Sequence, residues 1–453
     1  MRIKFISIFM LATTLMVGCS KDYLNINEVN PNQTQNPPIN PLLSSVTYQS
    51  ALNVNRAANI TAYYTQQLAS PNAASGSDIY DNVDRSSLWY NIYNTVKDGR
   101  LMQAQAVAAN GFQHVGVAKV MEAMNMSMLI DLFGDAPYSE AFDPAKLAPK
   151  YDKAEEIFSA CIRLLDEALA EFNKASPTIT LDAASDLIHG GSVNAWKKTA
   201  NALKARLLNR LSKKSTYNPT QILAALSAAY TSNADDAQLT RFTARSPWNQ
   251  AAYNNTQLLL DAWMSDYSIK VLNGTTYGVF DPRIKYISDT TKFGDYRGTP
   301  NGKGRTGTGT NKEESYLSEK NGFYSKSGAP LLLVTYAEMK FIEAEATSAT
   351  DKTRSYNAYL AGIAAHMDKL GVSIAEKDAY LTNPAVAVGV TNFTRDLIFK
   401  EKYLAMFLHP EAWTDARRYD YKYKNFTLPV NAVLPTFIRR VGYPTTETDR
   451  NSA

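Results

Sequence analysis

Apolar residues recur every three or four positions through much of this chain, and residues 152–172 show the period clearly. The apolar positions there are Ile157, Cys161, Leu164, Leu165, Ala168 and Phe172, and the charged positions on the opposite face are Glu155, Glu156, Arg163, Asp166 and Glu167. One apolar and one charged face predict an amphipathic helix that packs against other helices.

The same period predicts further helices along the chain. They cover residues 43–68, 87–109, 115–132, 193–211, 219–230, 335–347, 354–370 and 394–408. We therefore expect an all-α fold in which helix pairs form a tetratricopeptide-like scaffold, although the chain shows no strict repeat of about 34 residues.

The helical pattern largely fails over residues 238–330. One helix is possible between Trp248 and Trp263, and the remainder is rich in Gly, Thr, Asn and Tyr. A loop region this long inside a compact protein is usually functional or disordered. We expect a single body over residues 42–453, with this segment as its loop-rich, ligand-facing portion.

The first 18 residues resemble a signal peptide. Arg2 and Lys4 precede an apolar stretch, and small residues stand directly before Cys19. This predicts a lipoprotein signal, cleaved before Cys19 so that the cysteine is acylated, although Met16 stands where such signals usually have Leu. An ordinary secretory signal is the alternative. Residues 19–41 are rich in Asn and Pro and predict a flexible tether.

Charge and cysteine content exclude several classes of protein. The net charge of +4 over 453 residues is too small and too evenly spread to indicate nucleic-acid binding. With Cys19 acylated, Cys161 is the only other cysteine, so no disulfide framework can form. Its place on an apolar helix face predicts a buried structural thiol.

A glycine-rich stretch, Y-R-G-T-P-N-G-K-G-R-T-G-T-G-T, runs over residues 296–310 and contains G-x-G-x-x-G. A dinucleotide site needs an apolar strand before this motif and a helix after it, and neither pattern is present. We expect instead a flexible loop that adds almost no apolar area to the fold. It should become ordered only when ligand or a partner is bound.

Several motifs together resemble the SusD/RagB-like outer-membrane nutrient-binding lipoproteins, within the subgroup that opens with an N-P-N tether. They run in family order from one end of the chain to the other. They are N-P-N (30–32), D-L-F-G-D-A-P-Y-S-E-A (131–141), V-N-A-W-K-K-T-A-N-A-L-K-A-R-L-L-N-R (193–210), D-P-R-I (281–284), Y-R-G-T-P-N-G (296–302), L-L-V-T-Y-A-E-M-K-F-I-E-A-E-A (332–346), K-E-K-Y-L-A-M-F-L-H-P-E-A-W-T-D-A-R-R (400–418) and R-V-G-Y-P-T-T-E-T-D-R-N (440–451).

This resemblance implies a role without catalysis. Family members sit on the outer membrane over a SusC-like TonB-dependent transporter and act as its extracellular lid. They capture an oligosaccharide, or in some members a peptide, for import. The resemblance therefore implies a lipid-anchored protein that faces the extracellular side and needs no cofactor.

Most charged and aromatic residues inside these motifs are expected to serve the scaffold. Glu401 shares a helix face with leucines, so its carboxylate needs a cation, and Arg417 or Arg418 is the expected partner. Asp131 and Asp135 flank an F-G turn and are expected to cap it. Glu343 and Glu345 should point in different directions, and Trp196 and Trp413 are expected to be packing anchors.

Patterns typical of enzymes and metal sites are missing from the sequence. The four histidines, His114, His189, His366 and His409, form no H-E-x-x-H motif, and no G-x-S-x-G elbow occurs. We expect no catalytic residue, no metal and no cofactor. Two alternatives stay open: a lipid-anchored surface hydrolase whose carboxylates come from distant segments, and a purely structural solenoid adaptor.

The ligand-binding residues are sought among aromatic rings outside helix cores, because a sugar presents a face of C–H groups and a rim of hydroxyls. The candidate rings are those of Tyr80, Trp89, Trp248 and Tyr296, and Arg297 is the planar polar candidate next to Tyr296. For Trp89, packing against a neighbouring helix is an equal alternative. The identity of the ligand does not follow from the sequence.

Overall fold

The computed structural model describes residues 37–451. The predicted signal peptide, Cys19 and most of the predicted tether therefore lie outside the described residues. The first helix, α3 (Ile39–Tyr64), begins within the range predicted for the tether. Pro41 fits in its first turn because the amide groups there have no partner inside the helix.

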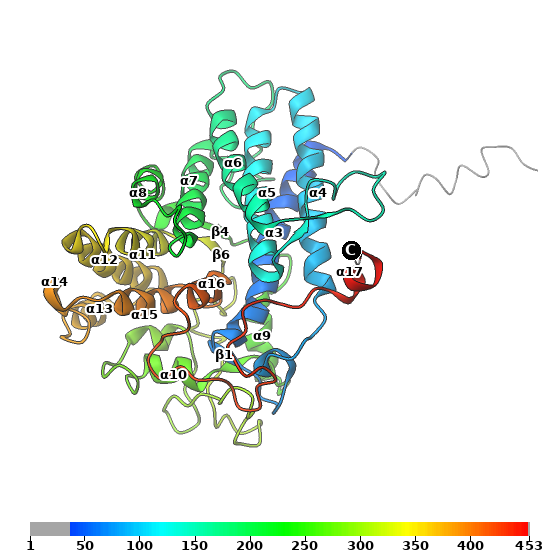
Figure 1. Cartoon of the computed structure of the whole chain (residues 1–453). Helices are drawn as coiled ribbons and strands as arrows, with labels where there is room; N and C mark the ends of the chain where they lie inside the picture. Colours follow the sequence, from blue (N-terminus) through cyan, green and yellow to red (C-terminus); the bar gives the residue numbers. More distant parts are fainter. Residues whose placement is uncertain (1–36, 452–453) are drawn as a thin grey trace, which may run out of the picture.

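The fold is all-α, as the periodicity predicted. The N-terminal half consists of long helices, α3, α4 (Ser86–Ala108), α5 (Phe112–Phe133) and α6 (Ala154–Phe172), which lie side by side in Figure 1. α7 (Val193–Arg210) and α8 (Pro219–Ser227) continue this layer. Each of these helices coincides with a predicted one to within a few residues at each end.

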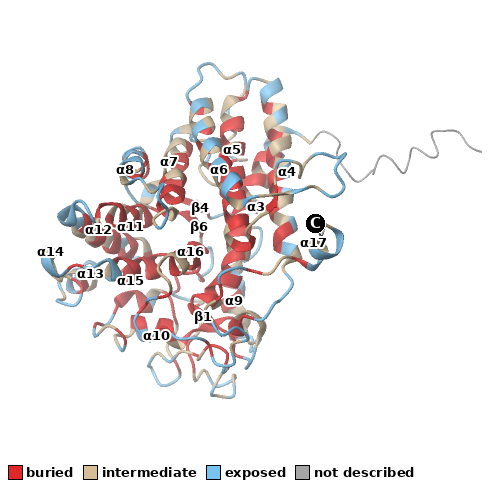
Figure 2. Cartoon of the chain, viewed as in Figure 1, coloured by how far each residue is buried: buried red, intermediate tan, exposed pale blue. Residues whose placement is uncertain are grey.

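The C-terminal half adds a second stack of helices. Its members are α11 (Tyr336–Thr347), α12 (Lys352–Leu370), α13 (Ile374–Leu381), α14 (Gly389–Asn392), α15 (Arg395–Ala405) and α16 (Glu411–Arg418), and α17 (Thr445–Arg450) follows near the chain end. The sequence predicted α11, α12 and α15 but not the short helices. Figure 2 shows that buried residues line the faces where neighbouring helices meet, and that exposed residues lie on the outside.

Residues between the two stacks form the loop-rich lower part of Figure 1. This part holds two short α-helices, α9 (Pro247–Thr256) and α10 (Asp266–Leu272), and the 3₁₀ helix η3 (Pro282–Tyr286). Two further 3₁₀ helices, η1 (Gly76–Ile79) and η2 (Asn233–Asp235), lie elsewhere in the chain. Strands are short and antiparallel: β1 (Leu68–Ala69) pairs with β5 (Trp263–Met264), β2 (Ala136–Pro137) with β3 (Tyr151–Asp152), and β4 (Ala237–Leu239) with β6 (Leu331–Val334).

Local chemistry explains where the helices begin and end. The side chain of Asp351 accepts a hydrogen bond of 2.9 Å from the amide of Arg354 and thereby caps α12. The same helix ends at Gly371, whose φ of 83° suits glycine. Among residues 37–451, no helix combines the length and apolar character that a membrane span requires.

The expected packing anchors are confirmed. Trp196 and Trp413 are buried, and the indole nitrogen of Trp196 donates to Asp186 at 2.7 Å. Cys161 is buried as predicted, and burial raises the pKa of its thiol. Glu343 and Glu345 point to different partners: Glu343 contacts Lys340 at 3.0 Å, whereas Glu345 contacts Lys402 at 2.8 Å.

Glu401 forms an ion pair as predicted, but the predicted partner was wrong. The Glu401 carboxylate contacts Lys400 at 2.5 Å and the guanidinium of Arg283, not Arg417 or Arg418. Arg418 contacts Glu345 instead, at 3.0 Å. Arg283 comes from the D-P-R-I motif, which the fold brings beneath α15.

The predicted turn-capping role of Asp131 and Asp135 was also wrong. Asp131 contacts Arg210 at 2.6 Å, so it joins α5 to α7. Asp135 accepts a hydrogen bond of 2.8 Å from the amide of Ala154, the first residue of α6. Asp131 thus pairs with a cation from another helix, and Asp135 caps the start of α6 rather than its own turn.

The glycine-rich stretch is packed in its first half, contrary to the prediction of a loop that adds little to the fold. Thr299, Asn301, Gly302 and Gly304 are buried. The Asp78 carboxylate accepts hydrogen bonds from Nδ2 of Asn301 at 2.5 Å and from the amide of Gly302 at 2.6 Å. Exposed residues alternate with half-buried ones over 305–310.

Candidate functional site

Three of the five predicted ligand-binding residues are buried, so their rings are not the exposed platforms that the prediction assumed. The exposed fraction is 3% for Tyr80, 2% for Trp89 and 4% for Trp248. Tyr80 packs edge-on against Tyr64, with ring centroids 5.8 Å apart. These rings are covered by segments far away in the sequence, which local composition does not reveal.

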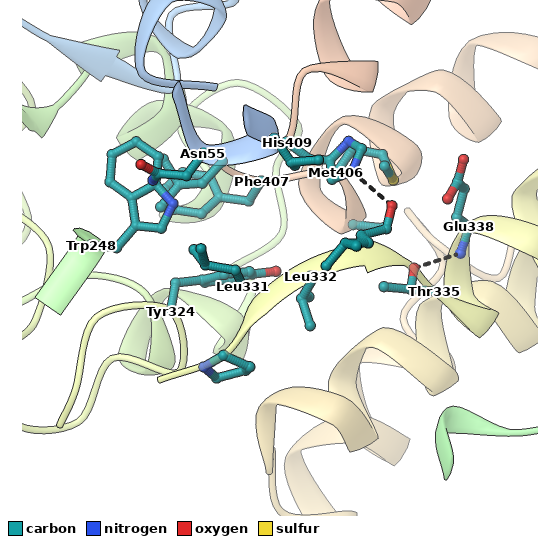
Figure 3. A pocket seen from close by; sticks show the side chains of 15 residues that line it. Asn55, Trp248, Tyr324, Leu331, Leu332, Thr335, Glu338, Met406, Phe407 and His409 are labelled. Atoms are coloured by element: carbon teal, nitrogen blue, oxygen red, sulfur yellow. Dashed lines mark hydrogen bonds between the residues drawn. The ribbon is translucent and has the colours of Figure 1, made fainter. Parts of the chain in front are cut away.

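Trp248 borders the narrow internal space drawn in Figure 3, together with Tyr324 and residues of β6. On its other side, Nε2 of His409 lies 3.0 Å from the carbonyl oxygen of Leu333. The free volume is about 20 Å³, which holds about one water molecule. This space is too small for any organic ligand.

Tyr296 and Arg297 lie in the loop-rich part of the molecule. Tyr296 is half-buried, and Arg297 is exposed. Nε of Arg297 contacts Asp295 at 2.8 Å, and its guanidinium lies 4.4 Å from the ring centroid of Phe293. The charge of Arg297 is thus already paired, although Phe293 itself is 57% exposed.

A cleft of about 340 Å³ lies between α4, the loop over residues 138–150 and α17. We call it the α4–α17 cleft. Its volume is at the lower end of small-molecule sites. The aromatic residues that line it are Trp89, Tyr90, Tyr93 and Phe142, and the polar ones are Asn94, Lys97, Thr446, Glu447, Arg450 and Asn451.

Aromatic rings form one side of the α4–α17 cleft. Trp89 lies at its base, held edge-on against Phe133 with centroids 5.1 Å apart. Tyr90 is the next residue of α4, and it is 41% exposed. The ring of Phe142 lies 6.0 Å from that of Tyr93 and carries the guanidinium of Arg100 at 4.3 Å. Phe142 is therefore fixed on one face.

Polar side chains of α4 and of the chain end line the rest of the α4–α17 cleft. Glu447 accepts a hydrogen bond of 3.0 Å from the hydroxyl of Tyr151, and Nδ2 of Asn451 donates to the carbonyl of Pro149 at 2.9 Å. Within residues 37–451, the side chains of Asn94, Lys97 and Arg450 form no hydrogen bond or ion pair. They are free to bond a ligand that rests against the rings.

The C-terminal segment that closes the α4–α17 cleft is anchored to the body. The amide of Thr445 donates to Asp84 at 3.0 Å, and the hydroxyl of Tyr443 donates to the carbonyl of Asp135 at 2.7 Å. The sequence pointed to Trp89 alone among the lining residues. Tyr90 and Phe142 were missed because the α17 residues that complete the α4–α17 cleft lie about 300 or more positions later in the chain.

This arrangement combines an exposed tyrosine ring, further rings below it, and unpaired amide and cationic groups. Flat rings bind the C–H face of a hydroxyl-rich molecule, and planar polar groups bond its hydroxyls. Glu447 is the only carboxylate among the described residues that line the cleft. The α4–α17 cleft is therefore suited to hold such a ligand.

Comparison with solved structures shows the same fold in other proteins. A SusD/RagB family protein from Bacteroides thetaiotaomicron is 22% identical, with 92% of this chain and 94% of that chain covered and a TM-score of 0.73. A SusD homologue from Bacteroides fragilis is also 22% identical, with 92% and 93% covered and a TM-score of 0.75. A chitin-binding SusD homologue from Flavobacterium johnsoniae is 21% identical, with 91% and 92% covered and a TM-score of 0.74.

A search of curated proteins finds no match to this sequence. A family model described as SusD-like, "Starch-binding associating with outer membrane", matches residues 31–444. That match includes both helical stacks, the loop-rich part between them, and most of the residues that form the α4–α17 cleft. It agrees with the motifs from which the resemblance was predicted. The chain therefore belongs to the SusD-like family.

Proposed function

We propose that this protein captures a glycan, or alternatively an oligopeptide, in the α4–α17 cleft and delivers it to a SusC-like TonB-dependent transporter as its extracellular lid. The observation that carries the proposal is the exposed ring of Tyr90 beside unpaired Asn94 and Lys97 on one helix of a SusD-like fold. The family description, starch-binding and associated with the outer membrane, supports a saccharide.

Binding without hydrolysis fits the α4–α17 cleft better than catalysis does. A glycosidase needs two carboxyl groups flanking the scissile bond, about 5 to 10 Å apart. Among the described lining residues Glu447 alone supplies one, and it already accepts the Tyr151 hydroxyl. We therefore propose a binding protein. Product analysis after incubation with polysaccharides tests this, because released sugars would favour the surface hydrolase.

The ligand site is tested by calorimetry with a panel of oligosaccharides and peptides. Tyr90→Ala removes the exposed ring and should weaken binding by about tenfold or more, since stacked aromatic anchors dominate such sites. Phe280→Ala is the matched control, because it removes a ring that is 47% exposed and lines neither the α4–α17 cleft nor the surface around Arg297. Equal affinity of Tyr90→Ala and the unaltered protein would refute this location.

Tyr296 and Arg297, with Phe293, form the second candidate surface. The exposed Phe293 ring favours it, whereas the pairing of Arg297 with Asp295 speaks against a free charge there. Tyr296→Ala and Arg297→Ala belong in the same calorimetric series. A loss of affinity in these variants, with Tyr90→Ala unaffected, would move the site to this surface.

Membrane attachment and partner choice are tested separately. Cys19→Ala should release the protein from the outer membrane if acylation of Cys19 is its anchor. The experiment needs a strain without the transporter, in which a variant that still sediments with outer membranes would refute the lipoprotein proposal. Co-purification of a TonB-dependent transporter with the unaltered protein from solubilised outer membranes tests the delivery role.

A further inference from the structure

A second cleft lies on the loop-rich part of the molecule and shares no residue with the α4–α17 cleft. Its volume is about 320 Å³. Its walls are α10, the turn after α10, Pro300 with Asn301, and the segment over residues 425–430. We call it the α10 cleft. The two clefts are of similar size but are built from different elements.

Hydrogen bonds between its walls hold the α10 cleft open. The amide of Val430 donates to the carbonyl of Asn301 at 2.9 Å, and Nε2 of Gln66 donates to the carbonyl of Thr427 at 2.6 Å. Asn301 is fixed in turn to the carbonyl of Leu68 at 2.9 Å. A site whose walls are already bonded to the body loses little conformational freedom when a ligand enters.

The chemistry of the α10 cleft is polar but uncharged overall. Its two charged residues neutralise each other, because Nζ of Lys270 contacts Oδ2 of Asp266 at 2.5 Å. The remaining polar side chains are amides and hydroxyls. Those of Thr275, Asn425 and Thr427 bond no other side chain or backbone group within residues 37–451. Their donors and acceptors remain available to a hydroxyl-rich ligand.

The same walls do not offer the Val430 amide or the Thr427 carbonyl to an extended peptide. An extended peptide can bind by adding to a free strand edge through backbone hydrogen bonds. Here the Val430 amide and the Thr427 carbonyl are already bonded within the protein. Leu428 and Val430 offer half-exposed apolar surface beside the free amide and hydroxyl groups. That combination matches the C–H face and hydroxyl rim of a sugar ring.

Two residues that border the α10 cleft have an unusual backbone conformation. Gln66 and Asn425 both border the α10 cleft and both have positive φ, at 52° and 61°. This region is unfavourable for residues other than glycine, and such residues gather at ligand-binding sites. At Asn425 the backbone directs an amide side chain, which has no hydrogen-bond partner among residues 37–451, to the border of the α10 cleft.

We propose that the α10 cleft is a second binding site, for one or two rings of an uncharged saccharide. This site does not need the α4–α17 cleft, so each proposal can be refuted without refuting the other. On a polysaccharide the two sites would bind one chain together or two neighbouring chains. Either arrangement raises the apparent affinity for polymer above that for a short oligosaccharide.

The test uses neutral trisaccharides, maltotriose and N,N′,N″-triacetylchitotriose, with a uronic acid trisaccharide and a tripeptide as alternative probes. Crystals of residues 37–453 soaked at high probe concentration should show a neutral saccharide in the α10 cleft. An α10 cleft that stays empty with both neutral probes, or that takes the uronate or the peptide in preference, would overturn the proposal.

Substitutions in the α10 cleft test whether the saccharide seen in crystals also binds there in solution. Asn425→Gly removes the amide but keeps a residue that tolerates positive φ, and Thr427→Val removes a hydroxyl at nearly constant size. Together they should weaken one class of sites at least about tenfold. Asn431→Gly is the control, because Asn431 also has a positive φ of 60° but does not line the α10 cleft. Unchanged binding in the double variant would refute the second site.

Tyr90→Ala distinguishes this proposal from the proposed function. If the second site exists, Tyr90→Ala does not change the affinity of the class of sites that Asn425→Gly weakens. If Tyr90→Ala and the double variant weaken the same sites, the α10 cleft is not an independent site. If Tyr90→Ala weakens binding and the double variant does not, the proposed function stands and the second site is refuted.

Discussion

The guanidinium of Arg283 contacts the carboxylate of Glu401 although the two residues are 118 positions apart, and neither side chain reaches solvent. Arg283 also contacts Asp281 at 2.5 Å, and Lys400 contacts Glu401 at the same distance. Burial alone would raise the pKa of Glu401, but Lys400 and Arg283 lower it to about 2. The carboxylate is thus ionised in the folded protein and depends on its partners.

Removing one member of this cluster should destabilise the fold strongly. In Arg283→Met the carboxylates of Asp281 and Glu401 lose a buried partner, which costs about 3–5 kcal/mol of unfolding free energy. Denaturant unfolding at neutral pH measures the loss. Arg354→Met is the control, because Arg354 pairs with Glu343 at the surface with 47% of its side chain exposed. It should change stability by less than about 1 kcal/mol.

The packing of the glycine-rich stretch gives a second prediction. Gly302 and Gly294 have nearly the same backbone conformation, with φ of 77° and 79°. A Cβ on Gly302 would overlap the carbonyl oxygen of Val430, whereas a Cβ on Gly294 would meet nothing within 4 Å. Both substitutions by alanine incur the cost of positive φ, about 1–2 kcal/mol.

Gly302→Ala should therefore cost at least about 1 kcal/mol more than Gly294→Ala, because overpacking adds to the conformational strain. Thermal and denaturant unfolding of the two variants measure the difference. Equal stability of the two variants would mean that the contact between residue 302 and Val430 is loose in solution. The sequence-based prediction of a flexible loop would then describe this stretch better than the packed conformation does.

His409 gives a pH-dependent prediction. Its Nε2 lies 3.0 Å from the carbonyl of Leu333, and its Nδ1 accepts a hydrogen bond of 3.1 Å from the amide of Glu411. Both nitrogens are satisfied only in the neutral ring, since a proton on Nδ1 would face the Glu411 amide. Burial, and then the charge of Arg206, lowers the pKa of His409 from 6.5 to about 3.

A lowered pKa means that the unfolded chain binds the proton more tightly, so the stability that His409 contributes is lost as pH falls below about 6.5. Between about pH 6.5 and pH 5 this loss is roughly 1–2 kcal/mol. Urea unfolding at several pH values should show a shallower decline for His409→Gln than for the unaltered protein. Asp78 and Asp236, whose pKa values burial raises to about 6, act in the opposite direction in both proteins. Parallel pH profiles would contradict the prediction.

Much of the fold was accessible from the sequence because helix positions depend on local periodicity. The apolar face of α6 is complete within its own 19 residues, and its C-terminal end at Phe172 was predicted correctly. The short helices were missed because they contain too few turns to show a period. α16, for example, spans only eight residues directly after Pro410.

Burial and pairing depend on segments that are distant in the chain, and local sequence does not show them. A helix starting near Trp248 was expected, and α9 is that helix, but the local sequence did not show that α9 buries the Trp248 ring. Arg417 and Arg418 follow Glu401 in one motif, but Arg283 from the D-P-R-I motif reaches Glu401 instead. Tyr90 was hidden beside Trp89 because the cleft exists only once α17 lies against α4.

Trp89 offers a direct readout of ligand binding, because it alone of the five tryptophans lines the α4–α17 cleft. Its ring is buried at the base of the α4–α17 cleft, so a bound ligand would change its surroundings without displacing it. A glycan selected by calorimetry should therefore shift the tryptophan fluorescence in proportion to occupancy.

Trp89→Phe should abolish the shift while calorimetry still detects binding, since the exposed Tyr90 ring remains. Trp263→Phe is the control and should keep the shift. A shift that persists in Trp89→Phe would show that the ligand occupies another place on the molecule, and would remove the main support for the α4–α17 cleft as the capture site.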